Sequence, residues 1–105
     1  NFSIRIVKLY KYLTDEKKVF VLSKQLLRSG TSIGANVYEG EFAQSKADFV
    51  NKMSIALKEA NETQYWLELL YRSDVIDEKA FLSLDNDAKQ ITGTLVKIIN
   101  SSKNK

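Results

Sequence analysis

The chain has 105 residues and a formal net charge of +3, with no cysteine, histidine or proline. A chain of this length forms one domain, and without cysteine it has no disulfides, thiol nucleophile or cysteine metal site. Without histidine it lacks the usual general base near neutral pH and the commonest transition-metal ligand. We therefore expect no enzymatic activity, no metal and no cofactor. No apolar run is long enough to span a membrane, and the absence of cysteine leads us to expect a protein of the reducing cytoplasm.

Apolar residues recur at a helical period in four segments, and no segment alternates as a strand would. The first helix is expected to end near Thr14 and Asp15, and the second to start near Glu16 or Lys17. The third opens at Ser45 with a capping-box pattern. The fourth is expected to begin at a cap on Asp77. We predict an all-α fold, an up-down-up-down antiparallel four-helix bundle over residues 1–100, followed by a polar tail at 101–105.

Small residues on the second and third helices predict a close helix–helix seam. With a turn near residue 43, Ser29 would lie level with Ala56, and Gly40 would follow the helix end with a positive φ. The full set of predicted seam residues is Ser29, Gly30, Gly34, Asn36, Ala56 and Ala60. A buried Asn36 amide would fix the register of the helices.

The first helix, counted from Asn1, is too short to cover all of the second helix. Either residues upstream extend it, or another subunit covers the half of the second helix around Ile33 to Gly40.

The glycines between Arg28 and Phe42 do not form a nucleotide-binding loop. A Walker loop needs lysine and then serine or threonine after its last glycine, whereas Glu41 and Phe42 follow Gly40. A dinucleotide fingerprint also fails, because no strand-like run precedes the stretch.

Two stretches carry a resemblance to a known family. The motif that starts at Gln25 and Arg28 and continues as SIGANVYEG, residues 32–40, resembles the signature of a bacterial four-helix-bundle family encoded within intervening sequences of 23S ribosomal RNA genes. Residues 55–67 are similar to that family's third helix. Tyr38 departs from the pattern, since the family often has alanine there.

The resemblance implies a non-enzymatic homo-oligomer, a pentamer in known relatives. It also implies kinship with the accessory proteins of diversity-generating retroelements, which bind nucleic acid and a reverse transcriptase through basic surfaces.

Positive charge is concentrated at the N-terminal end. Residues 1–28 carry seven Lys and Arg against two acidic residues, whereas residues 29–70 carry three against six. Such cations, with tyrosines among them, can contact phosphates and stack on bases. The candidate nucleic-acid-binding residues are Arg5, Lys8, Tyr12, Lys17, Lys24 and Arg28. The alternative is an ordinary solvated helix face.

A second apolar strip lies on the third helix, outside its core stripe. It consists of Ile55, Tyr65, Trp66 and Leu69, at positions that a monomeric bundle leaves polar, and it predicts an oligomer interface. The alternative is a splayed bundle that buries the strip internally.

Acidic residues on the second and third helices are expected to form ion pairs rather than a metal or acid–base site. Glu59 and Glu62 would lie level with Arg28 or Gln25. Two functions stay open: an oligomer that binds RNA or DNA, and a protein-interaction scaffold with no direct contact to nucleic acid.

Overall fold

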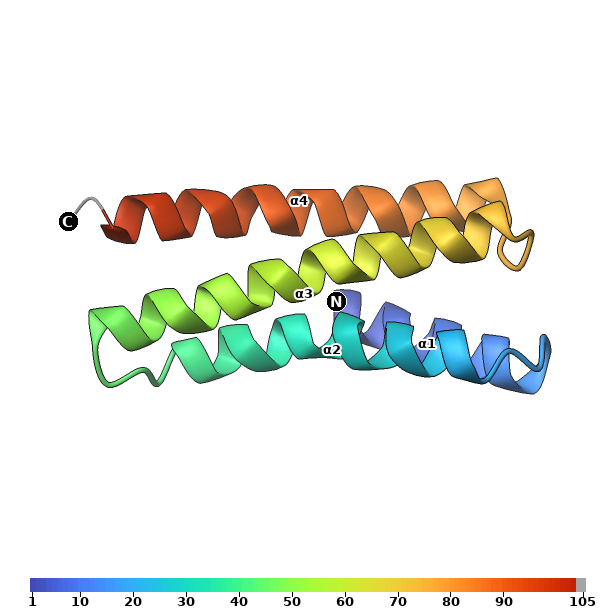
Figure 1. The fold of residues 1–105 in the computed structure, drawn as a ribbon, viewed down its shortest axis with the longest axis horizontal. Helices are drawn as coiled ribbons and strands as arrows, with labels where there is room; N and C mark the ends of the chain where they lie inside the picture. The colour runs from blue at the N-terminus through green and yellow to red at the C-terminus, as the bar shows by residue number, and fades with distance from the viewer. Residues whose placement is uncertain (104–105) are drawn as a thin grey trace.

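Four α-helices make up residues 1–103, the part of the chain described by the structure, which is a computed structural model, and no strand occurs in that range. They are α1 (Phe2–Asp15), α2 (Val21–Gly40), α3 (Lys46–Arg72) and α4 (Glu78–Lys103). Successive helices run antiparallel, and each packs mainly on the next one in the chain (Figure 1). The predicted all-α fold with four helices is confirmed. None of the four helices combines the length and the apolar character needed to cross a membrane.

Side-chain caps fix most of the helix starts. The Ser45 Oγ accepts a hydrogen bond from the Asp48 N–H at 3.0 Å, and the Asp77 Oδ1 accepts one from the Ala80 N–H at 2.8 Å. Both predicted caps are thus confirmed, and each satisfies a backbone donor that the first helical turn leaves free.

The predicted start of α2 is wrong, because this helix begins only at Val21. Lys18 has a φ of 57°, in the left-handed region that a continuous α-helix does not adopt, so residues 16–20 form a linker. At the other end of the chain, α4 runs on to Lys103. Ser101 and Ser102 are therefore helical rather than part of a polar tail, and residues 104–105 lie outside the described residues.

The core consists of two clusters that lie one after the other along the bundle. The first cluster draws buried side chains from all four helices and the α3–α4 connection: Ile6, Leu13, Leu26, Leu67, Leu70, Ile76 and Leu84. The second draws its buried side chains from α2, α3 and α4 only: Ile33, Met53, Ala56, Ala60, Leu95 and Ile99. From α1 only Phe2 packs against the second cluster. We call the first cluster the covered half of the bundle and the second cluster the open half.

The α2–α3 register differs from the prediction by about one heptad. The Ser29 Oγ accepts a hydrogen bond from the Thr63 Oγ1 at 3.0 Å, with both side chains fully buried, whereas the sequence placed Ser29 level with Ala56. At the far end of α2, Gly40 lies against Met53, so the first turns of α3 extend beyond the end of α2 (Figure 1). The connection between α2 and α3 is therefore asymmetric, whereas the sequence led us to expect a symmetric turn near residue 43.

The glycines of α2 have other roles than the predicted ones. A Cβ on Gly30 would lie 2.8 Å from the Ile6 Cγ2, so Gly30 allows close packing of α1 rather than of α3. Gly34 is exposed and faces Ser3, also on α1. Gly40 is the last helical residue and has no positive φ; its missing side chain makes room for Met53.

The predicted register-fixing role of Asn36 is also wrong. This residue is half-buried, and its Nδ2 donates to the Ser32 carbonyl oxygen at 2.8 Å and lies 3.2 Å from the Ser32 Oγ. Both partners lie one turn earlier on the same helix, so the amide is satisfied locally. The buried pair of Ser29 and Thr63 supplies the polar cross-helix contact instead.

Candidate nucleic-acid interface

Arg5 extends from α1 to α4, with 40% of its side chain exposed. Its Nη1 lies 2.5 Å from the Asp87 Oδ2, and its Nη2 donates to the Ser83 Oγ at 2.9 Å. These bonds join the two outer helices of the bundle. The guanidinium charge is compensated by a carboxylate, so Arg5 is a weaker candidate for phosphate binding than the sequence suggested.

Arg28 forms ion pairs with two carboxylates of α3, as predicted from its position along α2. Its Nη1 lies 3.1 Å from the Glu59 Oε2, and its Nη2 lies 2.6 Å from the Glu62 Oε2. The hydrogen bond to Glu62 raises the pKa of Arg28, and the same bond lowers the pKa of the Glu62 carboxyl below its ordinary value of 4.5. Arg28 therefore joins α2 to α3, and the predicted ion pairs are confirmed.

The Glu62 carboxyl should make stability depend on pH. Because its pKa is lower in the folded chain than in the unfolded chain, its stabilising effect is complete above pH 4.5 and is lost as pH falls through the folded-state pKa. For a pair that is partly exposed we expect the effect to be about 1 kcal/mol. Urea unfolding between pH 6 and pH 3 should show this loss in the wild type and a smaller one in Arg28→Met.

Arg72→Met is the matched control for this experiment. Arg72 also pairs with a glutamate, Glu68, but at 3.4 Å and with 75% of its side chain exposed. We expect this variant to keep the pH dependence of the wild type. An Arg28→Met protein whose stability falls with pH as steeply as that of the wild type would contradict the role given to Glu62.

The remaining candidates, Lys8, Tyr12, Lys17 and Lys24, are exposed. Within residues 1–103 none of these three lysines forms an ion pair. Lys11 and Lys18 are also exposed and, within residues 1–103, form no ion pair; they contribute to the basic excess but were not among the predicted candidates. The N-terminal basic excess is therefore carried at the surface by five lysines.

Tyr12 and Lys17 lie beside acidic groups. They line a hollow of about 610 Å³ at the end of the bundle where α3 turns into α4, together with Asp74, Asp77 and Glu78. These carboxylates repel phosphate. The six candidate residues thus fall into different surroundings: Arg5 contacts α4, Arg28 contacts α3, and Tyr12 and Lys17 lie at an acidic end. They do not form one compact patch within a single copy of the chain.

The apolar strip on α3 is only partly exposed. Trp66 is half-buried and packs against the first core cluster, as do neighbouring side chains of α1 and α2. Ile55 and Leu69 are also half-buried, while Tyr65 is 59% exposed and forms a T-shaped contact with the Trp66 ring, with centroids 5.1 Å apart. Tyr65 is therefore the member of the strip most available to a partner.

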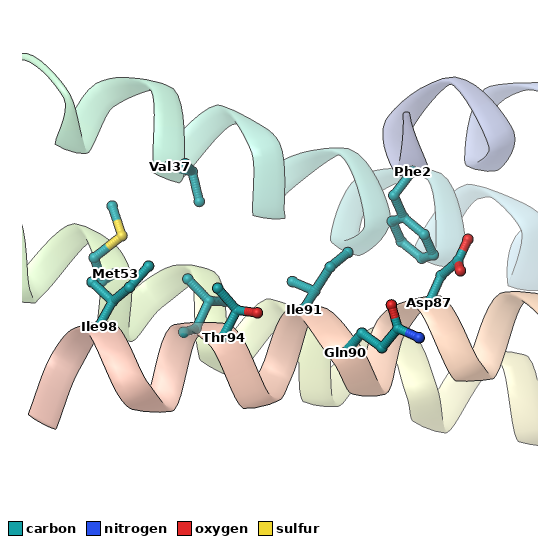
Figure 2. Close-up of a pocket in the computed structure, with 9 residues that line it drawn as sticks. Phe2, Val37, Met53, Asp87, Gln90, Ile91, Thr94 and Ile98 are labelled. Carbon is teal, nitrogen blue, oxygen red and sulfur yellow. The ribbon is translucent and has the colours of Figure 1, made fainter.

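The open half of the bundle contains a groove. The sequence indicated this region only through the difference in length between the first two helices. The groove has a volume of about 430 Å³ and lies between α2 and α4 over α3, beginning at the ring of Phe2 (Figure 2). Its apolar lining comprises Phe2, Val37, Met53, Ile91, Leu95 and Ile98. Asp87, Gln90 and Thr94 supply its polar groups. The groove occupies the space beside α2 that the first helix does not reach.

Comparison with known proteins identifies the family. The family model for 23S rRNA-intervening sequence proteins matches residues 1–97. A crystal structure of a protein of unknown function from the S23 ribosomal protein family of Bacteroides thetaiotaomicron is 60% identical, with a TM-score of 0.93, over 93% of this chain and 91% of that chain. No curated protein matches the chain. The protein therefore belongs to the family of 23S rRNA-intervening sequence proteins.

Proposed function

We propose that the protein is a non-enzymatic, self-associating cytoplasmic bundle that binds structured RNA through the lysines of its N-terminal region, residues 8–24. The observation that carries this proposal is that the arginines and the lysines of residues 1–28 have different surroundings. Arg5 and Arg28 are held by carboxylates, whereas five lysines remain exposed and, within residues 1–103, without an ion pair. Those lysines are Lys8, Lys11, Lys17, Lys18 and Lys24. Exposed lysines gain affinity for a phosphate backbone by releasing its condensed counterions.

Self-association would strengthen the weak positive electrostatic potential of a single copy. One copy carries a net charge of only +3 and spreads its lysines over several surroundings. Repetition of the N-terminal segment around a ring brings equivalent lysines of neighbouring copies together and raises the local potential. The family resemblance suggests five subunits, and the α3 strip with Tyr65 at its exposed edge is the proposed contact between them. A reverse transcriptase is a further candidate partner on the same resemblance.

Charge reversal at two lysines tests the proposal. We expect Lys8→Glu/Lys24→Glu to weaken binding of a labelled RNA hairpin at least about tenfold, and to reduce the slope of log affinity against log salt by about 2, since about two phosphate contacts are lost. Arg28 is left intact, because reversing its charge would also disturb the α2–α3 ion pairs. The measurement is a fluorescence-anisotropy titration at 50 mM and 150 mM salt.

Lys58→Glu/Lys97→Glu makes the same change in net charge on α3 and α4, where both lysines are exposed. It should retain most of the affinity. Equal losses in the two variants would indicate a response to net charge alone and would contradict the assigned surface. If the wild-type oligomer shows no saturable RNA binding at low salt, the RNA proposal fails and the scaffold function is favoured.

A further inference from the structure

A run of apolar residues, 19–22, spans the end of the α1–α2 linker and the start of α2. Val19 and Leu22 pack against the first core cluster. Phe20 and Val21, which lie between them in the chain, are 60% and 76% exposed. Polar residues at these two positions would leave the buried face of the helix unchanged. The packing of the bundle therefore does not account for the exposed ring of Phe20.

Hydrogen bonds on both sides of Phe20 fix its outward position. The Val19 N–H donates to the Leu13 carbonyl oxygen at 2.9 Å, and the buried Ser23 Oγ donates to the Phe20 carbonyl oxygen at 3.0 Å. Between α1 and these bonds the chain turns at Lys18, whose φ of 57° is uncommon outside glycine. The ring is thus presented at the end of the bundle where α3 also turns into α4 (Figure 1).

Phe20 differs from the other well-exposed aromatic side chains. Within residues 1–103 the aromatic residues that are more than half exposed are Phe20, Tyr38, Phe42 and Tyr65. Tyr38 and Phe42 pack on each other with centroids 5.3 Å apart, and Tyr65 packs on Trp66. Phe20 forms no ring contact of this kind in the described part of the chain. Its ring is therefore available to an aromatic group from outside the protein.

Lysines lie on both sides of this ring in the chain. Lys18 precedes Phe20 by two residues, and Lys24 follows one helical turn later, where its N–H donates to the Phe20 carbonyl oxygen at 3.2 Å. Both lysines are exposed and, within residues 1–103, form no ion pair. Neither lines the acidic hollow that Lys17 lines. The nearest acidic residue in the chain is Glu16, four residues before the ring.

We propose that Phe20 stacks on an unpaired base of the RNA while Lys18 and Lys24 contact the phosphates beside that base. This inference rests on the proposed function and narrows its ligand to RNA with a single-stranded loop, bulge or end. Bases inside an A-form duplex are already stacked, whereas unpaired bases stack readily on aromatic side chains. Residues one helical turn apart have Cβ atoms about 5–6 Å apart, so a ring and a cation at that spacing can contact the base and a phosphate of one nucleotide.

A membrane surface is the other partner that exposed apolar residues among lysines could contact. Helices that bind a membrane surface bury a whole apolar face in it. The apolar faces of α1 and α2 are instead occupied by the two core clusters, which leaves only Phe20 and Val21 at this end of α2. Stacking on a base needs no more than one ring. RNA is therefore the favoured partner.

The first test compares two RNAs with the same number of phosphates, a hairpin with an unpaired loop and a fully paired duplex. We expect the wild type to prefer the hairpin at least about fivefold, the weaker end of base–aromatic stacking. Phe20→Ala should lose this preference, and Phe20→Tyr should keep it because a tyrosine ring also stacks. The Phe20 side chain makes no capping hydrogen bond to α2, so the alanine variant should keep its fold, which thermal unfolding checks.

The salt dependence separates a base contact from a phosphate contact. Phe20→Ala should leave the slope of log affinity against log salt unchanged, because it removes no phosphate contact, whereas Lys8→Glu/Lys24→Glu should reduce that slope. Phe42→Ala is the matched control. It removes a ring that is 69% exposed just beyond the other end of α2, directly after Glu41, and it should bind both RNAs as the wild type does.

The second test places an indole ring at the site. Indole fluorescence is quenched when the ring stacks on a base, so Phe20→Trp should lose fluorescence as the hairpin saturates it. The wild type contains a single tryptophan, Trp66, and sets the background signal. Phe42→Trp is the control and should change no more than the wild type does.

Equal affinities of the wild type and Phe20→Ala for the hairpin would overturn the stacking contact and leave the lysine surface of the proposed function in place. Absence of saturable RNA binding by the wild type would overturn both. A lower mass of Phe20→Ala in sedimentation would make the ring a contact between subunits. A fluorescence shift of Phe20→Trp with phosphatidylserine vesicles but not with RNA would make it a membrane contact, and either result would overturn the assignment to RNA.

Discussion

Replacing Gly30 with leucine is expected to destabilise the bundle by about 2–3 kcal/mol. A Cβ at this position would lie 2.8 and 2.9 Å from two carbons of Ile6, a residue with no exposed surface. Isoleucine is branched at Cβ and has little rotamer freedom in a helix, so α1 must move away from α2. Leucine is also the better helix former by up to about 1 kcal/mol, and the loss is therefore a packing effect. Chemical denaturation measures it.

Two further variants isolate the cause of this loss. Gly93→Leu makes the same substitution in α4, where an added Cβ meets nothing within 4 Å, and it should keep or slightly increase stability. Ile6→Ala combined with Gly30→Leu should lose less than the sum of the two single changes, because the alanine makes room for the leucine. Additive losses would show that Gly30 and Ile6 are not in contact.

A leucine-to-alanine change should cost more in the covered half than in the open half. Leu67 is fully buried in the first core cluster, and we expect Leu67→Ala to lose about 3–5 kcal/mol through lost burial and the cavity it leaves. Leu95 is 3% exposed but lines the groove. Neighbouring side chains can relax into that space, so we expect Leu95→Ala to lose about 2 kcal/mol.

Urea midpoints and slopes for both variants test this difference, because the chemical change is the same. Leu82→Ala, at a residue that is 54% exposed, serves as the surface control and should cost less than about 1 kcal/mol. A loss at Leu95 equal to that at Leu67 would mean that the open half is as tightly packed as the covered half.

The helices and their buried faces could be predicted from the sequence, but the register between them could not. The buried residues of α3 include Met53, Thr63 and Leu70, which share one face of the helix at helical spacing. Periodicity says which face of a helix is buried. It does not fix how far one helix slides along another when small residues such as Ser29 and Ala56 can face several partners.

The candidate nucleic-acid interface could also be predicted only in part from the sequence. Charge counting located the basic excess in residues 1–28, and helix level predicted that Arg28 pairs with Glu59 and Glu62, but the pairing of Arg5 with Asp87 was not predicted. Asp87 is 82 residues away from Arg5 in the chain, on α4. The lengths of the first two helices, counted from Asn1, indicated an uncovered stretch of α2 around Ile33 to Gly40, but they did not predict the groove or its lining.

The serial packing of the helices also bears on how fast the chain folds. Each main contact joins consecutive helices, α1 with α2, α2 with α3 and α3 with α4, so each forms by closing a loop of only about five residues. Topologies dominated by such local contacts fold in microseconds to milliseconds. The chain contains no proline, so peptide-bond isomerisation adds no slow phase of tens of seconds. A newly made chain is therefore expected to complete its fold quickly.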